Sequence, residues 1–415
     1  MLLAVPNMAR GGISSIQALA GGHPHRWAML AGVWLLYASF GLTAGSLAPL
    51  VGPITRDLGI GHAAMGVVFG AWQLVYIFSA APGGMAMDRI GPRRTLFAAG
   101  MMIALSGLLR AGSDSYAFLL FAVAVFGIGG PLVSVGAPKV IALWFEGSER
   151  AFAMGIYITG PSLGMIGALA LTNPVLMPLL DQDWRAVLAV FAGLSAAASL
   201  GWLMISAHPE ARRIERALAA EPRESLFRVY GGLLRLRTVQ LMLAMSVGVF
   251  FFNHGLNNWL PTLLRTRGLE PAVADLWAMT PTLIGIAGSL LIPRLATPRR
   301  RLPILFALLA AALAATLLLH FQPGPLLGVG LVLQGVARSS LMTVSVLILV
   351  ELPEIGARRA GAASGLFFSA AEIGGVTGPL TLGAISQTTG SFDMALYALS
   401  GIMIVLIILA TRLKR

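Results

Sequence analysis

The chain has 415 residues, of which 57% are hydrophobic and only 11% are charged, and its formal net charge is +12. A soluble domain contains about 25% charged residues, so this composition excludes an ordinary soluble protein and indicates a polytopic membrane protein with little mass outside the bilayer. The chain contains no cysteine, which excludes disulfides, thiolate metal sites and cysteine nucleophiles.

Twelve apolar stretches follow one another along the chain, and nearly every charge falls in the gaps between them. A stretch of about 18 or more residues with few charges is long enough to span a bilayer as a helix. We therefore expect twelve transmembrane helices, at residues 27–50, 63–87, 95–109, 116–144, 151–172, 186–206, 238–264, 272–293, 302–319, 325–350, 360–385 and 394–410.

The basic residues predict how these helices are oriented. Most of the 29 Lys and Arg residues fall in segments on the same side of the predicted helices as the two chain ends. By the positive-inside rule, this side is the cytoplasm. Membrane topology thus explains the basic charge, and we expect no nucleic-acid partner. The expected location is the cell (inner) membrane, with several spans and both termini in the cytoplasm.

The first six predicted helices resemble the last six. Residues 155–164 in the fifth predicted helix align with residues 365–374 in the eleventh, at an offset of 210 residues. Parallel repeats of this kind place a substrate site near the bilayer midplane, between the halves. The expected organisation is a cytoplasmic tail, a six-helix half, a cytoplasmic linker, a second six-helix half and a short tail, at residues 1–26, 27–207, 208–237, 238–411 and 412–415.

The loop between the second and third predicted helices carries the most specific motif. It reads Gly84-Met85-Ala86-Met87-Asp88-Arg89-Ile90-Gly91-Pro92-Arg93-Arg94. This resembles the loop signature of the major facilitator superfamily, in which a glycine, an Asp-Arg pair, a second glycine and two basic residues recur at these spacings. The resemblance implies an all-α membrane protein with twelve transmembrane helices in two pseudo-symmetric halves.

The same resemblance implies a role for the loop, which in this family latches the two halves together on the cytoplasmic side. The residues that match the motif are Gly84, Asp88, Arg89, Gly91, Arg93 and Arg94. The chemistry is reasonable for these residue types, because Gly91 supplies backbone freedom at a chain reversal and Asp88 can meet a helix N-terminus or an arginine. In the second half Arg294 stands where Asp88 stands in the first, so we expect an asymmetric latch.

A glycine-rich segment in the fifth predicted helix, Gly160-Pro161-Ser162-Leu163-Gly164, resembles in part a motif of proton-coupled antiporters in this superfamily. The next residue of that motif is a glycine, and here it is Met165. We therefore favour helix packing with a proline kink as the function of this segment.

Two charged residues lie about midway along their predicted helices, where charges are costly and usually face a cavity. Arg338 shares a helix face with Gln334 and Ser345. Its guanidinium can hold a carboxylate through two parallel hydrogen bonds, so we expect it to bind a substrate anion. The alternative is an internal ion pair with Glu372. Glu372 is the candidate for carrying a coupled proton.

The seventh predicted helix concentrates polar residues between Asn253 and Asn258. Four polar residues in six positions are hard to bury against lipid, so this helix is expected to line a cavity. The resulting substrate-site candidates are His254, Asn257 and Asn258, together with Tyr37, Gln73 and Tyr157 on three other helices. The segment is similar, over a short length, to its counterpart in cyanate and nitroimidazole transporters.

These observations predict a secondary active transporter that works by alternating access and not an enzyme. The expected cargo is a small organic anion, such as a monocarboxylate, moved with a proton by a monomer embedded in lipid. The six histidines show no metal-ligand spacing and no ATP-binding loop occurs, so we expect no metal, no cofactor and no primary pumping. The alternative function is a proton-coupled exporter of drugs or other small molecules.

Overall fold

The computed structural model describes residues 23–145, 147–219, 231–296, 299–350, 352 and 355–414. Nearly all of these residues are helical, and the described part of the chain contains no β-strand. The first helices are α2 (Arg26–Gly45), η1 (Ala48–Leu50), α3 (Val51–Leu58), α4 (His62–Ile90), α5 (Pro92–Ala111), α6 (Tyr116–Trp144), α7 (Gly147–Tyr157), α8 (Thr159–Leu171), η2 (Thr172–Leu176), α9 (Met177–Leu179), α10 (Trp184–Ile205) and α11 (Pro209–Ala219). The others are α13 (Arg237–Thr266), α14 (Pro271–Ala278), α15 (Thr280–Leu295), α16 (Arg301–Leu318), α17 (Pro325–Val350), α18 (Gly356–Thr389), α19 (Asp393–Thr411) and η3 (Arg412–Lys414).

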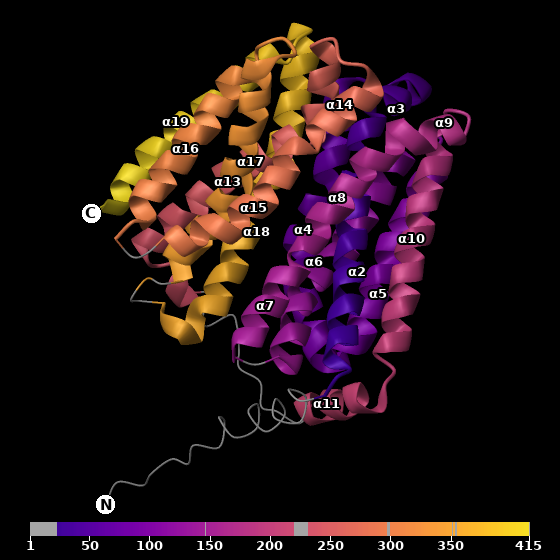
Figure 1. The fold of residues 1–415 in the computed structure, drawn as a ribbon, viewed down its shortest axis with the longest axis vertical. Coiled ribbons are helices and arrows are strands. Elements are labelled where there is room, and N and C mark those ends of the chain that lie inside the picture. Colours follow the sequence, from indigo (N-terminus) through magenta and orange to yellow (C-terminus); the bar gives the residue numbers. More distant parts are fainter. Residues whose placement is uncertain are drawn as a thin grey trace, which may run out of the picture.

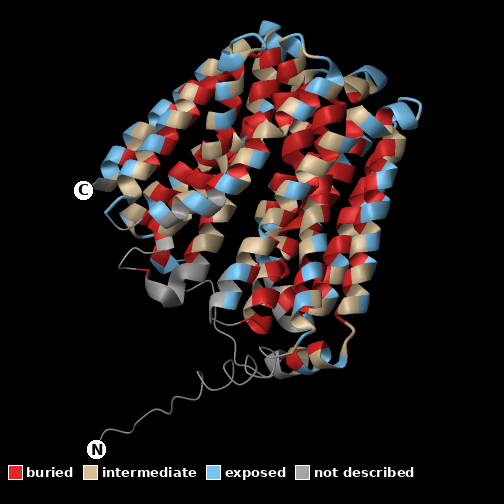
Figure 2. Cartoon of the chain, in the orientation of Figure 1, coloured by how far each residue is buried: buried red, intermediate tan, exposed pale blue. Residues whose placement is uncertain are grey.

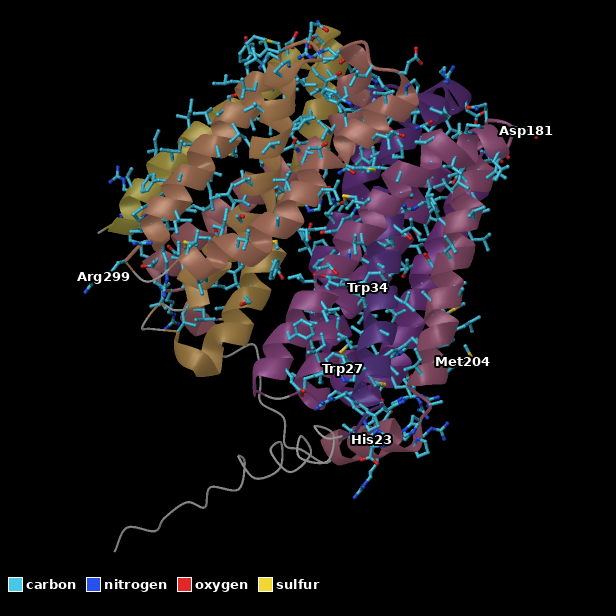
Figure 3. All side chains as sticks on the ribbon, viewed as in Figure 1. His23, Trp27, Trp34, Asp181, Met204 and Arg299 are labelled. Atoms are coloured by element: carbon cyan, nitrogen blue, oxygen red, sulfur yellow. The ribbon has the colours of Figure 1, made fainter. Side chains whose placement is uncertain are left out.

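The helices fall into two groups that are consecutive in sequence (Figure 1). The first helix group, α2 to α10, and the second helix group, α13 to α19, meet mainly along α4 and α18. The ribbons of the two groups separate towards the end where α11 lies, which we call the linker end. In Figure 3, His23 and Met204 lie towards the linker end, and Asp181 lies at the opposite end.

Within the described residues, ten helices are long and apolar enough to cross a membrane. The stretches predicted at residues 272–293 and 360–385 are not among them. The first is divided at Met279 into α14 and α15, and the second lies within α18, which has 34 residues but is rich in Gly, Ala, Ser and Thr. Small and hydroxyl side chains lower hydropathy without preventing a helix, so the count of twelve spans stays a prediction.

Prolines explain where the long helices are interrupted. The predicted fifth span is divided at Ile158, three residues before Pro161, and the eighth is divided at Met279, two residues before Pro281. Proline cannot donate to the carbonyl one turn earlier, and its ring disfavours the α conformation of the preceding residue. The first span was predicted to end near residue 50. In the structure α2 is followed by η1 and α3, and the helical segment extends to Leu58.

Equivalent glycines bring two helices into backbone contact in each group. A Cβ atom on Gly164 of α8 would lie 1.9 Å from the carbonyl oxygen of Ala38 in α2, and one on Gly374 of α18 would lie 1.9 Å from the carbonyl oxygen of Val247 in α13. Only glycine permits such approach. The two residues are 210 positions apart, as in the sequence alignment. Equivalent glycines therefore make the same kind of close helix contact in both repeats.

The two groups also contact each other through glycines. A Cβ atom on Gly66 of α4 would lie 2.6 Å from the carbonyl oxygen of Pro379 in α18, and one on Gly70 would lie 2.9 Å from that of Val376. Both glycines lie in the half of α4 that begins at the opposite end. Buried side chains line the interior of each group, whereas many exposed ones lie on the outer helices α10, α16 and α19 (Figure 2).

The linker contains an amphipathic helix, α11, that packs beneath the first helix group (Figure 1). Ala211 and Ile214 are buried, whereas Arg212 and Arg213 are exposed. The Glu215 carboxylate accepts a hydrogen bond from the backbone N–H of Arg93, at 3.3 Å, at the start of α5. Linker and loop are therefore in direct contact at this end.

Candidate functional site

A small cavity of about 20 Å³ lies between the two helix groups. The first group contributes α2, η1 and α8 to its wall, and the second contributes α13, α14 and α15. The lining residues are Ala44, Gly45, Ala48, Met165, Leu169, Asn257, Asn258, Leu260, Ala278 and Thr282. The wall is thus mostly apolar, with hydrogen-bonding groups from the second group.

Arg338, on α17, is held beside this cavity by two of its lining residues. Its Nη1 donates to the hydroxyl of Thr282 at 2.9 Å, and its Nη2 approaches the sulfur of Met165 at 3.5 Å, across the boundary between the groups. Both partners are uncharged. Among the described residues no acidic side chain forms an ion pair with Arg338, so the alternative of an internal pair with Glu372 is wrong for this conformation.

Glu372, on α18, lies in a different environment. The residue is 5% exposed, and its Oε2 atom has no hydrogen-bond partner among the residues that the structure describes. A Cβ placed on Gly375, one turn later, would be within 3.5 Å of Glu372, Gln73 and His254, which shows how closely these three side chains gather. Burying an ionised carboxylate without a cation is costly, so this environment suits a carboxyl that is protonated while it is buried.

Gln73 and His254 join the two helix groups next to Glu372. The Nε2 atom of Gln73, on α4, is 3.2 Å from the Nδ1 atom of His254, on α13. Gln73 is fully buried and its Oε1 atom has no partner among the described residues. The His254 ring lies between Trp72 and Phe250, with centroids 5.9 Å and 5.4 Å away. The imidazole is therefore held by aromatic packing as well as by one hydrogen bond.

Three tyrosines of the first helix group, Tyr37, Tyr76 and Tyr157, are buried or partly buried outside the cavity lining. Tyr37 of α2 stacks on Tyr157 of α7 with ring centroids 5.6 Å apart. Ser134, on α6, and Glu372 both lie in the neighbourhood of Tyr37 and Tyr76, and the Ser134 hydroxyl donates to the carbonyl of Gly130 at 3.2 Å. Sequence reasoning named Tyr37 and Tyr157 but missed Tyr76 and Ser134, which no motif distinguishes.

The asparagines of α13 have different roles. Asn257 and Asn258 line the cavity, as expected. Asn258 also donates to the carbonyl of His254 on its own helix at 2.8 Å, and Asn253 donates to the backbone carbonyl of Arg338 at 3.3 Å. Asn253 therefore supports α17 at the residue that carries the guanidinium. Gln334, one turn before Arg338, is 1% exposed, and its Oε1 atom lacks a partner in the part of the chain that the structure describes.

The loop motif has a clear structural reason at one position. Gly91 has φ of +93°, which side chains other than glycine rarely adopt, and a Cβ there would lie 1.9 Å from the carboxylate of Glu215. Arg93 begins α5 beside this contact, and Arg94 is exposed. The side chains of Gly84, Asp88, Arg89 and Arg294 lie outside the described residues.

Sequence reasoning also missed the partners of Arg338. Thr282 follows Pro281, and the break that this proline favours lies just before it at Met279. A threonine near a helix break is too common to indicate a site. Met165 was noticed only as the residue that departs from a glycine motif, whereas in the structure its sulfur meets the guanidinium from the other helix group.

Comparisons with known proteins agree with this architecture. The sequence model of the Major Facilitator Superfamily matches residues 33–352. The crystal structure of the nucleoside transporter NupG superposes with a TM-score of 0.76 at 15% identity, over 95% of this chain and 100% of that one. The predicted family and the predicted fold class are therefore confirmed.

Three curated relatives cover most of the chain. A Cupriavidus necator protein named "Probable sulfoacetate transporter SauU" is 25% identical over 387 residues, 85% of each chain. An Escherichia coli protein named "Probable galactarate/D-glucarate transporter GudP" is 23% identical over 389 residues, 83% of each. An Acinetobacter baumannii protein named "Quinolone resistance transporter" is 26% identical over 388 residues, 84% of each.

Proposed function

The chain belongs to the Major Facilitator Superfamily, whose members are membrane transporters and not enzymes, and we propose that it is a secondary active transporter of a small organic anion. Transport works by alternating access, in which the two helix groups rock about the cavity between them. Two of the relatives described above are named for organic acids, which supports an anionic cargo. The linker end faces the cytoplasm, as the distribution of basic residues predicts.

The state of Arg338 is the observation that carries this proposal. A guanidinium beside a cavity, bound among the described residues to just a hydroxyl and a thioether, keeps its positive charge available. A carboxylate can replace these weak partners with two parallel charge-assisted hydrogen bonds. Because this one guanidinium matches one anionic group, a monocarboxylate is the simplest cargo.

The neighbouring side chains supply the rest of the substrate site. Asn257, Asn258 and His254 donate or accept hydrogen bonds from the second helix group, and Gln73 and Gln334 have unused amide oxygens. Tyr37 and Tyr157 form an apolar wall with polar edges. The segment from Gly84 to Arg94, at the junction of α4 and α5, acts as the gate on the cytoplasmic side, where the backbone N–H of Arg93 already contacts the linker.

Glu372 couples transport to a proton in this proposal. The carboxyl is buried without a cation and lies against Gln73 of the other helix group. Rocking of the groups changes its access to water, so it can bind a proton in one conformation and release it in another. The protein then needs only its substrate, protons and lipid, and acts as a monomer.

The test is uptake into proteoliposomes with an imposed pH gradient. The assay compares small monocarboxylates, sulfonates and sugar acids with cationic drugs. We expect uptake of an acid by the parent protein, loss of that uptake in Arg338→Ala, and partial uptake in Arg338→Lys, because an ammonium keeps the charge but not the two-pronged geometry. Arg267→Ala, which removes an arginine paired with Asp393 away from the cavity, is the control.

The alternative function is proton-coupled export of drugs. The aromatic rings of Trp72 and Phe250 next to His254, and the relative named for quinolone resistance, favour it. In that case cationic or zwitterionic drugs are transported, Glu372 is essential and Arg338→Ala transports at the parental rate. The same proteoliposome experiment therefore separates the two functions.

A further inference from the structure

Asp275, on α14, is a buried carboxylate that binds residues of both helix groups. Its side chain has no solvent exposure. One carboxylate oxygen accepts from Nη2 of Arg265, at 2.9 Å, within the second group, and the other accepts from Nδ2 of Asn173 in the first group.

The carbonyl oxygen of Pro49, in η1 of the first group, accepts from the same two donors. Arg265 donates to it at 2.7 Å and Asn173 at 3.0 Å. This carbonyl is free because the residue four positions later is Pro53, which has no N–H to close a helical hydrogen bond. We call Pro49, Asn173, Arg265 and Asp275 the Asp275 cluster.

The cluster lies between the cavity and the opposite end. Ala48 and Ala278, which line the cavity, are one and three residues from Pro49 and Asp275. Arg265 lies seven residues beyond the cavity residue Asn258 along α13, which places it ~10 Å closer to the opposite end. Asn173 sits in η2, a π-helical turn, and such irregular turns often occur at functional sites.

We propose that the Asp275 cluster is the gate that closes the opposite end of the cavity, and that its opening admits or releases substrate on that side. This inference rests on the proposed alternating access. Arg265 and Asp275 stay together on the second group when the groups part, and only the uncharged Asn173 and Pro49 leave. The gate therefore opens without separating a buried charge from its counter-ion, which would cost far more.

Cysteine accessibility tests the gate directly, because the chain has no native cysteine. Ala44→Cys places one thiol in the cavity wall. Sealed vesicles of either orientation are treated with a membrane-impermeant maleimide, so that labelling reports the side from which the thiol is reached. We expect Asn173→Ala and Asp275→Asn, each combined with Ala44→Cys, to raise the labelling rate from the opposite end about tenfold, equivalent to ~1.4 kcal/mol.

A matched control uses an ion pair near the same end but within one helix group. Asp393→Asn breaks the pair between Arg267 and Asp393, which does not join the groups. It should label at the rate of Ala44→Cys alone. The gate would be overturned if Asn173→Ala and Asp275→Asn label at the same rate as Ala44→Cys alone. It would also be overturned if Asp393→Asn raises the labelling rate as much as Asn173→Ala does. Asp275→Asn leaves Arg265 without its counter-ion and can misfold. Asn173→Ala leaves that ion pair intact, so it tests the gate on its own.

Cross-linking provides the converse test. A short bis-methanethiosulfonate should link Asn173→Cys/Asp275→Cys by forming a disulfide with each thiol and releasing methanesulfinate. The link should stop transport, and reduction of the disulfides should restore it. Transport that continues in the cross-linked protein would contradict the gate. The labelling assay contains neither substrate nor a pH gradient. Its result is therefore independent of whether the cargo is an anion and whether a proton is coupled.

Discussion

At the scale of single residues, the two charges in the membrane interior are kept apart. Arg338 donates to Thr282 and approaches Met165, whereas Glu372 lies beside Gln73 and His254. Each is next to a residue of the first helix group. Movement of the groups therefore changes the surroundings of both charges together, which allows substrate binding and proton transfer to be linked without an ion pair between them.

Glu372→Gln tests the coupling role. Glutamine keeps the shape and hydrogen-bonding capacity of the carboxylic acid but cannot release a proton, so we expect accumulation driven by a pH gradient to be lost. Exchange of labelled for unlabelled substrate should continue, because it needs no net proton movement. Both rates are measured in the same proteoliposomes. Accumulation that still responds to the pH gradient would show that another group carries the proton.

At the scale of helices, glycine contacts set how closely neighbouring elements pack. Gly164 holds α8 against α2, and Gly374 holds α18 against α13. Two helices that contact through backbone can keep their relative position while the groups rock. We infer that these pairs form the rigid centre of each group.

Gly374→Ala should lower stability by about 1–3 kcal/mol, the usual cost of overpacking, because the added methyl group meets the carbonyl of Val247. Gly164→Ala should behave alike against Ala38. The control is Gly401→Ala on α19, where nothing lies within 4 Å of the new methyl group. Thermal unfolding of the purified variants gives the comparison; a melting temperature of Gly374→Ala equal to that of Gly401→Ala would contradict the packing argument.

The junction of α10 with the linker carries a histidine cluster. The ring of His208 stacks on His25 with centroids 4.1 Å apart and lies 5.3 Å from His23. Desolvation, and then the positive charge of His25 and His23, lowers the pKa of His208, while Glu210 opposes this shift. The folded protein therefore binds fewer protons at this site than the unfolded chain.

This difference predicts a pH dependence. Stability should fall as the pH decreases below about 6.5, the unperturbed pKa of histidine, because protons then favour the unfolded state. Thermal unfolding between pH 7.5 and pH 5.5, on the order of one unit either side of that value, should show a smaller loss in His208→Gln than in the parent. His320→Gln, at the opposite end, is the control. Equal pH slopes in the parent and in His208→Gln would refute the assignment.

At the scale of the whole molecule, the hydrogen bonds that described residues form between the two groups lie from mid-depth to the opposite end. They join Asn173 to Asp275, His62 to Ser386 and Gln73 to His254. The glycine contacts of Gly66 and Gly70 lie along the same stretch of α4. Alternating access also requires a conformation in which the groups separate at the opposite end. In that conformation these contacts must break.

Much of the fold was predictable because hydropathy and charge act along the chain. The predicted bounds of α6 and α17 are those observed, and the short predicted spans at residues 95–109 and 302–319 are present as α5 and α16. Gly91 was assigned to a chain reversal, where its φ is positive. Transmembrane length, loop charge and the loop motif are local properties that need no knowledge of partners.

The partners of the polar residues were not predictable in this way. From the sequence, Arg338 and Glu372 were expected at similar depth, where an ion pair was possible. In the structure Arg338 binds Thr282, whereas Glu372 lies near Gln73 and His254. Sequence reasoning assigned no site role to Thr282, Met165, Tyr76 or Ser134. Helix rotation and tilt depend on how ridges and glycines of two helices fit, and periodicity along one helix does not contain that information.

The sequence by itself determined that this is a membrane protein, that segments 210 positions apart resemble each other, and that it belongs among major facilitator transporters. Those conclusions rest on the cost of burying charge in lipid and on one loop motif, which are fixed by residue order. Only the tertiary structure decided that Arg338 meets Met165 across the groups and that Asp275 ties them together. Such contacts form between residues more than 100 positions apart, so packing in three dimensions sets them.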